Sequence, residues 1–458
     1  MQAGDLLKPL GPELSGFRDL GARVHAVSDR RVSGIPAARV EEFRTIQAHP
    51  FVIELIESGG LIGSTFVPGP SEGNEADRFA AFVEHPAIEF PSYPYEWPFA
   101  ALRAAALHHL DVQLSLLDLD MMIAGASAFD IQFQGVRPIL TDPLAIRRCD
   151  DAAAHWAYGQ FCREFLYPLL LTARAGLAFQ ALYRGNGNGI RPDTLASVLT
   201  LVSTLDSRVR KHVLAASKEP GSSPQVMSAF PKSAFVKLLR SLRDWIASLE
   251  PKGGRRMQIG PPLDVQGANE QITKFDVLRD FMARVRPGML LDLHCGSGDY
   301  SALALRSGAA AAVGVEANPY EADQAFRRAQ RTRRDMLVLT MDVAEPSPAQ
   351  GFRHAARKSF QERARFDALL AIDVLPQLTI ERRIAVEEAL PWVLQLAPTG
   401  VIEFAPAADL PMSVSDTLNR YEYPEADQFA ALLSAHSRIV RRMLISASGR
   451  TLFVYDRR

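Results

Sequence analysis

The stretch LLDLHCGSGDYS, Leu290–Ser301, decides the fold, because it joins an apolar strand-like run to a glycine-spaced turn and then to a helical segment. Glycines in such a turn let the backbone approach a ligand closely, and the free N–H groups at the start of the next helix bind polar groups. His294 occupies the position where such loops usually carry their first glycine. The stretch therefore predicts a site for a nucleotide-like cofactor.

The residues around this loop repeat a strand–helix rhythm. The strand-like segments MLLDL, AAVGVEA, MLVLTMDV, FDALLAID and GVIEFA alternate with helical segments, which predicts a mostly parallel sheet covered by helices. The last two strands, RIVRRMLISA and TLFVYDR, are joined only by SGR, so they must pair antiparallel. We expect an α/β fold with a Rossmann-like, mostly parallel seven-stranded sheet that ends in an antiparallel hairpin.

Acidic residues follow several of these strands. Glu316 lies 20 residues beyond Gly296, where a carboxylate can accept hydrogen bonds from both ribose hydroxyls of a cofactor. Asp342 follows the third strand and suits an adenine amino group, with Val343 against the ring. Asp373 follows the fourth strand, at the edge where an acceptor substrate would lie. Since ligands of open α/β sheets bind at the carboxyl ends of strands, these acids are expected to converge on one crevice.

Ser301 discriminates between two cofactor classes. A dinucleotide fingerprint needs a third glycine at this position, because that glycine makes room for the pyrophosphate. S-adenosylmethionine has no pyrophosphate, so the serine favours the methyl donor. The residues predicted to contact the cofactor are Asp292, His294, Cys295, Gly296, Gly298, Glu316, Asp342 and Val343.

The motifs DLHCGSG, VEAN, MDV and AID, in this order, resemble those of class I S-adenosylmethionine-dependent methyltransferases, from about Thr273 to Arg458. A narrower resemblance, to the NoeA-like group of two-part methyltransferases, rests on DVAEPSPAQGF and KSFQERARFDALLAIDVL. It also includes three N-terminal stretches, which are Phe90–Trp97, Ala126–Phe133 and Trp156–Leu169. That group tends to carry a histidine pair after the fourth strand, where this chain has Pro376 and Gln377.

The resemblance implies an enzyme that uses S-adenosylmethionine to methylate a small-molecule, glycan or lipid-linked acceptor, most simply on oxygen or nitrogen. It also implies that His294 is a tolerated variant, since loops of this family accept a bulky residue at the first glycine position. An acceptor hydroxyl or amine must lose a proton, and Asp373 is the candidate that takes it. Two alternatives stay open, a non-catalytic protein that binds the cofactor or a partner, and a nucleic-acid methyltransferase.

A seam rich in glycine, proline and charge, Glu250–Gly267, separates two differently patterned regions. It predicts an N-terminal α+β domain over 1–250, a linker over 251–270 and a methyltransferase domain over 271–458. Within the first domain, FVIELI and LIGSTFV flank ESGG and predict a hairpin, and DIQFQ and RPILTD predict another.

The N-terminal domain has kinase-like spacing without kinase residues. A protein kinase carries a catalytic Asp, then an Asn and then a metal-binding Asp at fixed spacing. The same spacing here falls on Gly125, Asp130 and Asp142, and only Asp142 is the residue type that a kinase needs. The chain has no lysine between Lys8 and Lys211 to pair with a phosphate. We expect a degenerate kinase-like module or an unrelated α+β fold that binds substrate or a partner.

Composition narrows the setting of the protein. Of 458 residues, 47% are hydrophobic and 22% charged, and the net charge is −1, which fits a globular protein and gives no global attraction to nucleic acid. Cys149, Cys162 and Cys295 are too scattered for a disulfide framework or a metal site. No signal peptide or membrane span is recognisable, so we expect a cytoplasmic, bacterial protein. The oligomeric state is not predicted.

Overall fold

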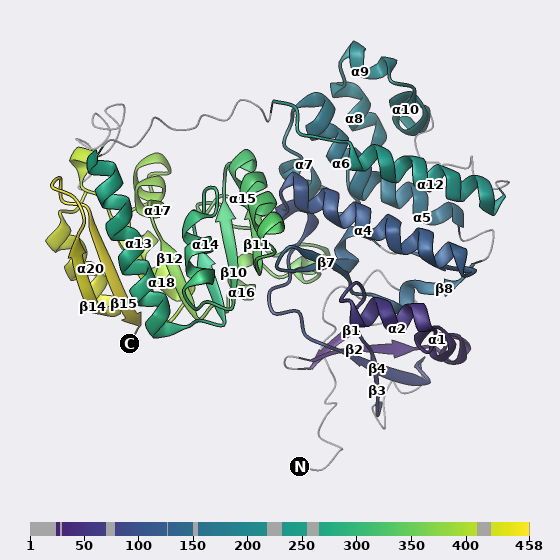
Figure 1. Cartoon of the computed structure of the whole chain (residues 1–458), viewed down its shortest axis with the longest axis horizontal. Coiled ribbons are helices and arrows are strands. Elements are labelled where there is room, and N and C mark those ends of the chain that lie inside the picture. The colour runs from purple at the N-terminus through teal and green to yellow at the C-terminus, as the bar shows by residue number, and fades with distance from the viewer. Residues whose placement is uncertain are drawn as a thin grey trace. The chain divides into compact units, whose positions relative to one another are not determined.

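The computed structural model describes residues 24–27, 30–69, 78–125, 127–149, 154–217, 231–253, 265–409 and 423–457. The chain forms two compact units (Figure 1). The first comprises Met1–Gly254 together with Pro348–Ser359, and the second comprises Arg255–Ser347 and Phe360–Arg458. Of the expected linker 251–270, residues 254–264 lie outside the described part of the chain, as does Ala126 at the start of the stretch Ala126–Phe133.

The second unit is built on a seven-stranded sheet with the order β11-β10-β9-β12-β13-β15-β14. Strands β9 to β13 pair parallel, whereas β15 is antiparallel to both β13 and β14. The expected sheet with its terminal antiparallel hairpin is therefore confirmed. The strands are β9 (Met289–Asp292), β10 (Ala311–Glu316), β11 (Met336–Thr340), β12 (Ala368–Ala371), β13 (Thr399–Phe404), β14 (Ser437–Leu444) and β15 (Thr451–Arg457).

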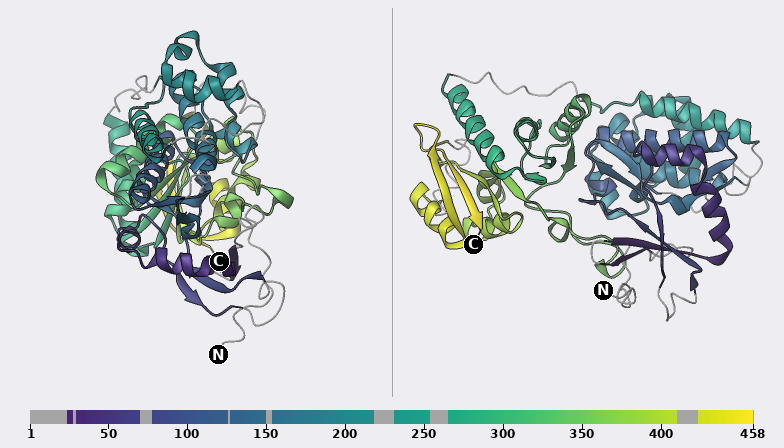
Figure 2. Two further views of the ribbon diagram at one scale, coloured as in Figure 1. Left: turned by 90° about the vertical axis from the view of Figure 1, so that its right-hand side faces the viewer. Right: turned by 60° about the horizontal axis from the view of Figure 1, so that its bottom comes forward.

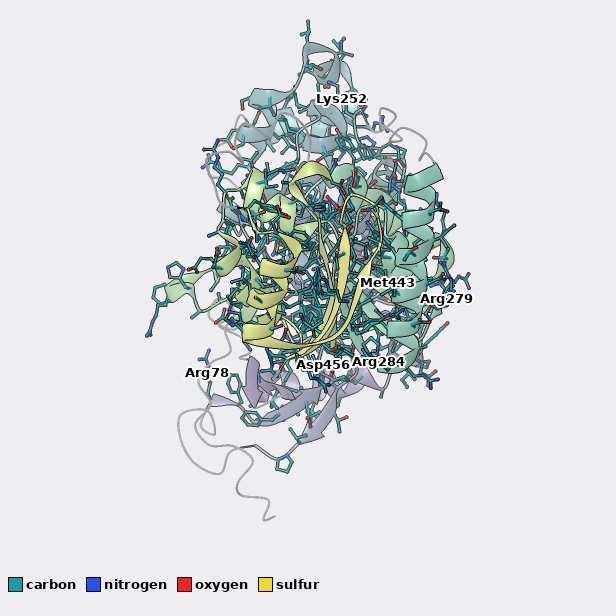
Figure 3. The ribbon with its side chains drawn as sticks, turned by 90° about the vertical axis from the view of Figure 1, so that its left-hand side faces the viewer. Arg78, Lys252, Arg279, Arg284, Met443 and Asp456 are labelled. Carbon is teal, nitrogen blue, oxygen red and sulfur yellow. The ribbon has the colours of Figure 1, made fainter. Side chains whose placement is uncertain are left out.

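Burial explains why the parallel strands could be found from their composition. Leu291, Val338 and Leu370 are fully or almost fully buried, because both faces of a parallel sheet are covered and its strands become continuously apolar. The hairpin is tied to β13 through Asp456 of β15, which is labelled in Figure 3. Its carboxylate accepts hydrogen bonds from Thr399 Oγ1 at 2.7 Å and from Arg438 at 2.8 Å.

Helices connect and cover these strands. Helix α15 packs on β10 and β11, α13 packs on α14, and α18 packs on α20. The helices of this unit are α13 (Val265–Val285), α14 (Asp299–Arg306), α15 (Pro319–Thr332), α16 (Phe360–Arg363), α17 (Val374–Pro376), η11 (Gln377–Glu381), α18 (Val386–Gln395), η12 (Ala407–Asp409) and α20 (Ala426–His436).

The first unit is α+β, and its four-stranded antiparallel sheet and its main group of helices form two distinct parts (Figure 2). The sheet has the order β1-β2-β4-β3, and two small pairs, β5 with β8 and β6 with β7, follow in the chain. The strands are β1 (Val24–Val27), β2 (Arg30–Ile35), β3 (Thr65–Val67), β4 (Ala81–His85), β5 (Met121–Ile123), β6 (Ile131–Gln134), β7 (Arg137–Leu140) and β8 (Ile146–Arg148).

Helix α4 packs along α12 in the first unit. The longer helices are α1 (Val40–Gln47), α2 (Pro50–Glu57), α4 (Phe99–Asp118), α5 (Ala154–Phe161), α7 (Gln180–Gly185), α8 (Pro192–Val198) and α12 (Lys232–Ala247). The shorter ones are η2 (Ala37–Arg39), η3 (Pro94–Glu96), η4 (Ala128–Asp130), η5 (Pro143–Ala145), η6 (Cys162–Leu166), α6 (Tyr167–Leu170), η7 (Leu171–Ala175), α9 (Leu201–Leu205), α10 (Ser207–Val209), η8 (Arg210–Leu214), α11 (Ala215–Ser217) and, in the segment Pro348–Ser359, η10 (Phe352–His354).

One of the two expected hairpins is wrong. The β6–β7 hairpin forms as expected from DIQFQ and RPILTD, but FVIELI lies in helix α2 instead of a strand. Helix α2 begins with Pro50 at its first position, and the His49 ring accepts a hydrogen bond from the Phe51 N–H at 3.3 Å. These start signals outweigh the β-branched content of the segment.

The segment Pro348–Ser359 packs in the first unit, although the sequence placed it with the predicted methyltransferase domain. There Gln350 donates to the Arg184 carbonyl at 3.2 Å, and the Arg357 guanidinium lies 4.6 Å from the Phe129 ring centroid.

Among the described residues, no helix is long and apolar enough to cross a bilayer.

Candidate cofactor site

The glycine loop follows β9 and leads into α14. Gly296 and Gly298 have φ values of +51° and +82°, a left-handed conformation that glycine adopts without steric cost. The Gly298 N–H donates to the Cys295 carbonyl at 2.8 Å and so closes the turn. His294 does not have a positive φ. The backbone at this position therefore does not need glycine, and the histidine is accommodated without strain.

Glu316, at the end of β10, fastens this loop to the next one. Its Oε2 accepts the Gly296 N–H at 3.0 Å, and its Oε1 accepts the Asn318 N–H at 2.7 Å. The His294 Nδ1 lies 3.5 Å from Oε2. The side chain is 2% exposed, so the two backbone donors hold it in one orientation. A carboxylate has about four acceptor positions, which leaves capacity for the two hydroxyls of a ribose.

Asp292 is fully buried at the end of β9 and is only half satisfied. Ser301 donates its hydroxyl to Asp292 Oδ2 at 2.6 Å, whereas Oδ1 has no hydrogen-bond partner among the described residues. Burial raises the pKa of the Asp292 carboxyl to about 6. Buried polar atoms are normally paired, so Oδ1 is a suitable acceptor for a polar group of a bound ligand. The serine that replaces the third glycine thus supports the site.

Cys295 has a packing role in the loop. Its N–H donates to the Val315 carbonyl at 3.0 Å, and a Cβ added to Gly314 would lie 2.8 Å from its Sγ. Burial raises the pKa of the Cys295 thiol well above its usual range. A thiol that stays protonated is a poor nucleophile, so this cysteine fits a role in shaping the loop.

Asp342 and Val343 follow β11. Asp342 Oδ1 accepts the Ala344 N–H at 2.9 Å, and Oδ2 forms an ion pair with Arg382. Val343 is 4% exposed. The sheet order places β11, β10, β9 and β12 side by side, so the predicted residues all lie at the carboxyl ends of four neighbouring strands.

Asp373 follows β12 and has a left-handed backbone with φ of +56°. Its Oδ1 accepts from Arg450 at 2.9 Å, and its Oδ2 lies 3.9 Å from Lys274 Nζ. The backbone N–H of Asp373 donates to Glu403 Oε2 at 3.3 Å. This acid therefore lies between two cations and is held by a second acid.

Sequence reasoning missed the residues that hold Asp373. Glu403 in β13 is fully buried, and it pairs with Lys274 at 2.8 Å and with Arg450 at 3.0 Å. Arg450 also binds Asp409 at 2.7 Å. The one sequence signal for this ion-pair network was the acid within the apolar strand GVIEFA, because a buried charge requires a partner.

Of the three positions with kinase-like spacing in the first unit, Asp130 and Asp142 lie close enough to influence each other. Burial, reinforced by the nearby Asp142 carboxylate, raises the pKa of Asp130 well above its usual range. Asp130 accepts the Ser127 N–H at 2.9 Å, and Asp142 accepts the Leu144 N–H at 3.0 Å. Gly125 has φ of +80°. In the described part of the chain, no group of three or more His, Cys, Asp or Glu residues is arranged to hold a metal ion.

Comparison with known proteins then places the chain. No protein-family model matches it. The nodulation protein NoeA of Rhizobium meliloti (strain 1021) is 31% identical over an alignment 467 positions long, and the match covers 98% of this chain and 96% of that protein. The chain belongs to the NoeA family. The resemblance to the NoeA-like group is thereby confirmed over nearly the whole length of this NoeA-family protein.

Two solved methyltransferase structures match part of the chain. Magnesium protoporphyrin IX methyltransferase (ChlM) of Synechocystis PCC 6803, with bound S-adenosylmethionine, has 17% identity and a TM-score of 0.32. The match covers 48% of this chain and 96% of that one. The N-methyltransferase NodS of Bradyrhizobium japonicum WM9 has 16% identity and a TM-score of 0.31, over 42% of this chain and 96% of that one. The Rossmann-like fold of the second unit rests on its own sheet, with five parallel strands and a terminal antiparallel hairpin.

Proposed function

We propose that this NoeA-family protein is a methyltransferase that binds S-adenosylmethionine at the carboxyl ends of β9, β10 and β11. The observation that carries the proposal is the hydrogen bond from the Gly296 N–H to Glu316 Oε2. It joins the glycine loop to the acid of the next strand, the two elements that would hold the ribose of the cofactor. Both belong to the same unit of the chain.

The residues present fit this cofactor. Glu316 retains acceptor capacity for ribose hydroxyls. Asp292 offers a polar or cationic group its buried Oδ1, which has no partner among the described residues. Asp342 is oriented by Ala344 and Arg382 for the adenine edge, and Val343 supplies an apolar surface for the ring. Cys295, Gly296 and Gly298 shape the loop, and His294 lies at its rim with its side chain 34% exposed.

When bound, S-adenosylmethionine supplies an electrophilic methyl carbon, and the chain has to align the acceptor with it and exclude water. We assign Asp373 as the group that takes the proton from an acceptor hydroxyl or amine. Lys274 and Arg450 fix its carboxylate from two sides. Glu403 holds both cations and the Asp373 backbone, and so acts as a positioning residue.

The acceptor is proposed to be a small molecule, a glycan or a lipid-linked intermediate. The N-terminal α+β domain, residues 1–250, would select it, and the methyltransferase domain, residues 271–458, would carry the chemistry. A near-neutral net charge of −1 does not favour nucleic acid as the acceptor. We also propose that the protein acts in the cytoplasm.

Calorimetry with S-adenosylmethionine tests the cofactor assignment. The wild type should bind. Glu316→Ala should lose at least about tenfold in affinity, because two charge-assisted hydrogen bonds disappear. The control variant Glu388→Gln, which changes an exposed acid of α18, should bind like the wild type. Absence of binding by the folded wild type would overturn the proposal.

A second measurement separates an enzyme from a binder. Radiolabelled methyl groups from S-adenosylmethionine should transfer into one fraction of a cell extract, and the chemistry of that fraction identifies the acceptor class. Binding without any transfer would instead support the non-catalytic alternative.

A further inference from the structure

Helix α9 exposes an unusual group of apolar side chains. Leu201, Val202 and Leu205 are 80%, 77% and 67% exposed, and Val198 at the end of α8 is 38% exposed. No other large apolar side chain in the described residues is as exposed as Leu201 or Val202. Isolated exposed apolar residues are normal, but neighbouring ones mark an interaction surface. These four residues are called the α9 patch.

Several backbone and hydroxyl groups around the patch are hydrogen-bonded to one another. The stretch VLTLVSTL, residues 198–205, carries no charge. The Thr200 hydroxyl accepts the Ser203 N–H at 3.3 Å and lies 3.0 Å from the Ser203 hydroxyl, and the Thr204 hydroxyl donates to the Leu201 carbonyl at 2.6 Å. Paired polar groups are far less costly to move out of water than unpaired ones. The stretch can therefore enter an apolar environment.

Cations border the patch. Arg210 and Lys211 are exposed at the start of η8, which packs against α9. Two acids lie nearby in the chain, and both are paired. Asp206 is neutralised by Arg208 at 3.1 Å and by Arg174 at 3.4 Å, and Asp193 by Arg191 at 2.6 Å. The outward charge beside the patch is therefore positive, which complements an anionic surface. In Figure 1, α9 and α10 lie at an outer end of the first unit.

We propose that the α9 patch, together with Arg210 and Lys211, docks this protein onto a lipid bilayer that carries anionic headgroups. Apolar side chains enter the boundary between headgroups and acyl chains while the adjacent cations bind the headgroups. A stable protein dimer buries about 800 Å² on each partner, which four side chains around a five-residue helix do not supply. A membrane surface needs only a few apolar residues next to cations.

Sedimentation with lipid vesicles tests this docking, using the full-length protein. The wild type should bind vesicles of phosphatidylcholine mixed with phosphatidylglycerol, and it should bind vesicles of phosphatidylcholine alone much more weakly. Binding should also weaken as salt is raised, because salt screens the headgroup attraction. Failure of the wild type to bind the anionic vesicles at low salt would overturn the proposal.

Two variants divide the contributions. The triple variant Leu201→Ser, Val202→Ser and Leu205→Ser should reduce partitioning onto anionic vesicles at least about tenfold, since three apolar side chains are lost. The pair Arg210→Gln and Lys211→Gln should reduce it about tenfold on anionic vesicles and leave it unchanged on neutral ones. Wild-type binding by either variant would contradict the assignment.

A matched control replaces exposed apolar residues elsewhere. Leu444 and Ile272 are 64% and 58% exposed in the second unit, and Leu444→Ser with Ile272→Ser should bind vesicles like the wild type. All variants should keep the wild-type unfolding midpoint, because the replaced side chains are exposed, and the wild-type cofactor affinity. Size-exclusion chromatography completes the test. A dimeric wild type together with a monomeric triple variant would assign the patch to self-association instead.

Discussion

Ser301 donates its hydroxyl to one oxygen of Asp292 at 2.6 Å, while the other oxygen of this buried carboxylate has no partner in the described part of the chain. The carboxyl pKa of about 6 exceeds the ordinary 3.8 because burial disfavours the charge. The folded protein therefore binds this proton more tightly than the unfolded chain does. Stability is lost as the pH rises from about 4 to about 6, and it stays lower above that window.

Asp292→Asn should remove this penalty. We expect the variant to be more stable than the wild type by about 2 kcal/mol at pH 7 and nearly equal at about pH 3, where the carboxyl is largely protonated in both states. Its affinity for S-adenosylmethionine should fall, because the negative acceptor is lost. Thermal unfolding at both pH values and calorimetry check this, and a variant less stable at pH 7 would contradict it.

His294→Gly should leave cofactor affinity equal or slightly better. The backbone at 294 does not adopt a positive φ, and Gly296 and Asn318 orient Glu316 without the imidazole. Glycine increases the entropy of the unfolded chain, so the unfolding free energy should drop by about 1 kcal/mol. Calorimetry and chemical denaturation measure the two effects. A large loss of affinity would mean that the imidazole itself contacts the cofactor.

Asp373→Asn should reduce methyl transfer into the acceptor fraction by at least about 100-fold while changing cofactor affinity little, as expected for a proton acceptor. Asp409→Asn is its matched control, because it removes another carboxylate bound to Arg450 without touching the site of proton transfer. Equal losses in both variants would show that Asp373 acts only through the ion-pair network, and unchanged turnover in Asp373→Asn would exclude it altogether.

Arg357→Ala should destabilise the first unit by about 1 kcal/mol, the size of a partly buried cation–π contact. Its guanidinium lies 4.6 Å from the Phe129 ring centroid. Arg353→Ala, an exposed arginine of the same short segment, should have no effect. Thermal unfolding of the two variants gives the comparison, and equal midpoints would mean that the Arg357 contact adds nothing to stability.

The strands of the second unit and the antiparallel pairing of the last two were predictable, because both follow from local rules. Buried parallel strands are continuously apolar, as Leu291 and Leu370 illustrate, and the three-residue link SGR leaves only antiparallel pairing for the last strands. Helix α2 was misread because FVIELI fits either a strand or a helix by composition. The decisive signals were the residues before it, His49 and Pro50.

The strand-end residues of the candidate site were predictable for the same reason, since position after a strand can be read along the chain. The partners of Asp373 were not. Lys274 lies in the helix before β9, and Arg450 lies in the turn of the terminal hairpin. Both reach Glu403 only in the folded unit, and ion pairs between such distant positions leave no periodic pattern in the sequence.

The segment Pro348–Ser359 has a consequence for the order of events during synthesis. The first unit is not finished when residue 254 leaves the ribosome, because Gln350 and Arg357 still have to reach Arg184 and Phe129. By the time they emerge, strands β9, β10 and β11 of the second unit have already been made. Both units are therefore incomplete at the same stage of synthesis. A gene divided at residue 250 would encode two fragments that each lack part of the contacts of the full chain.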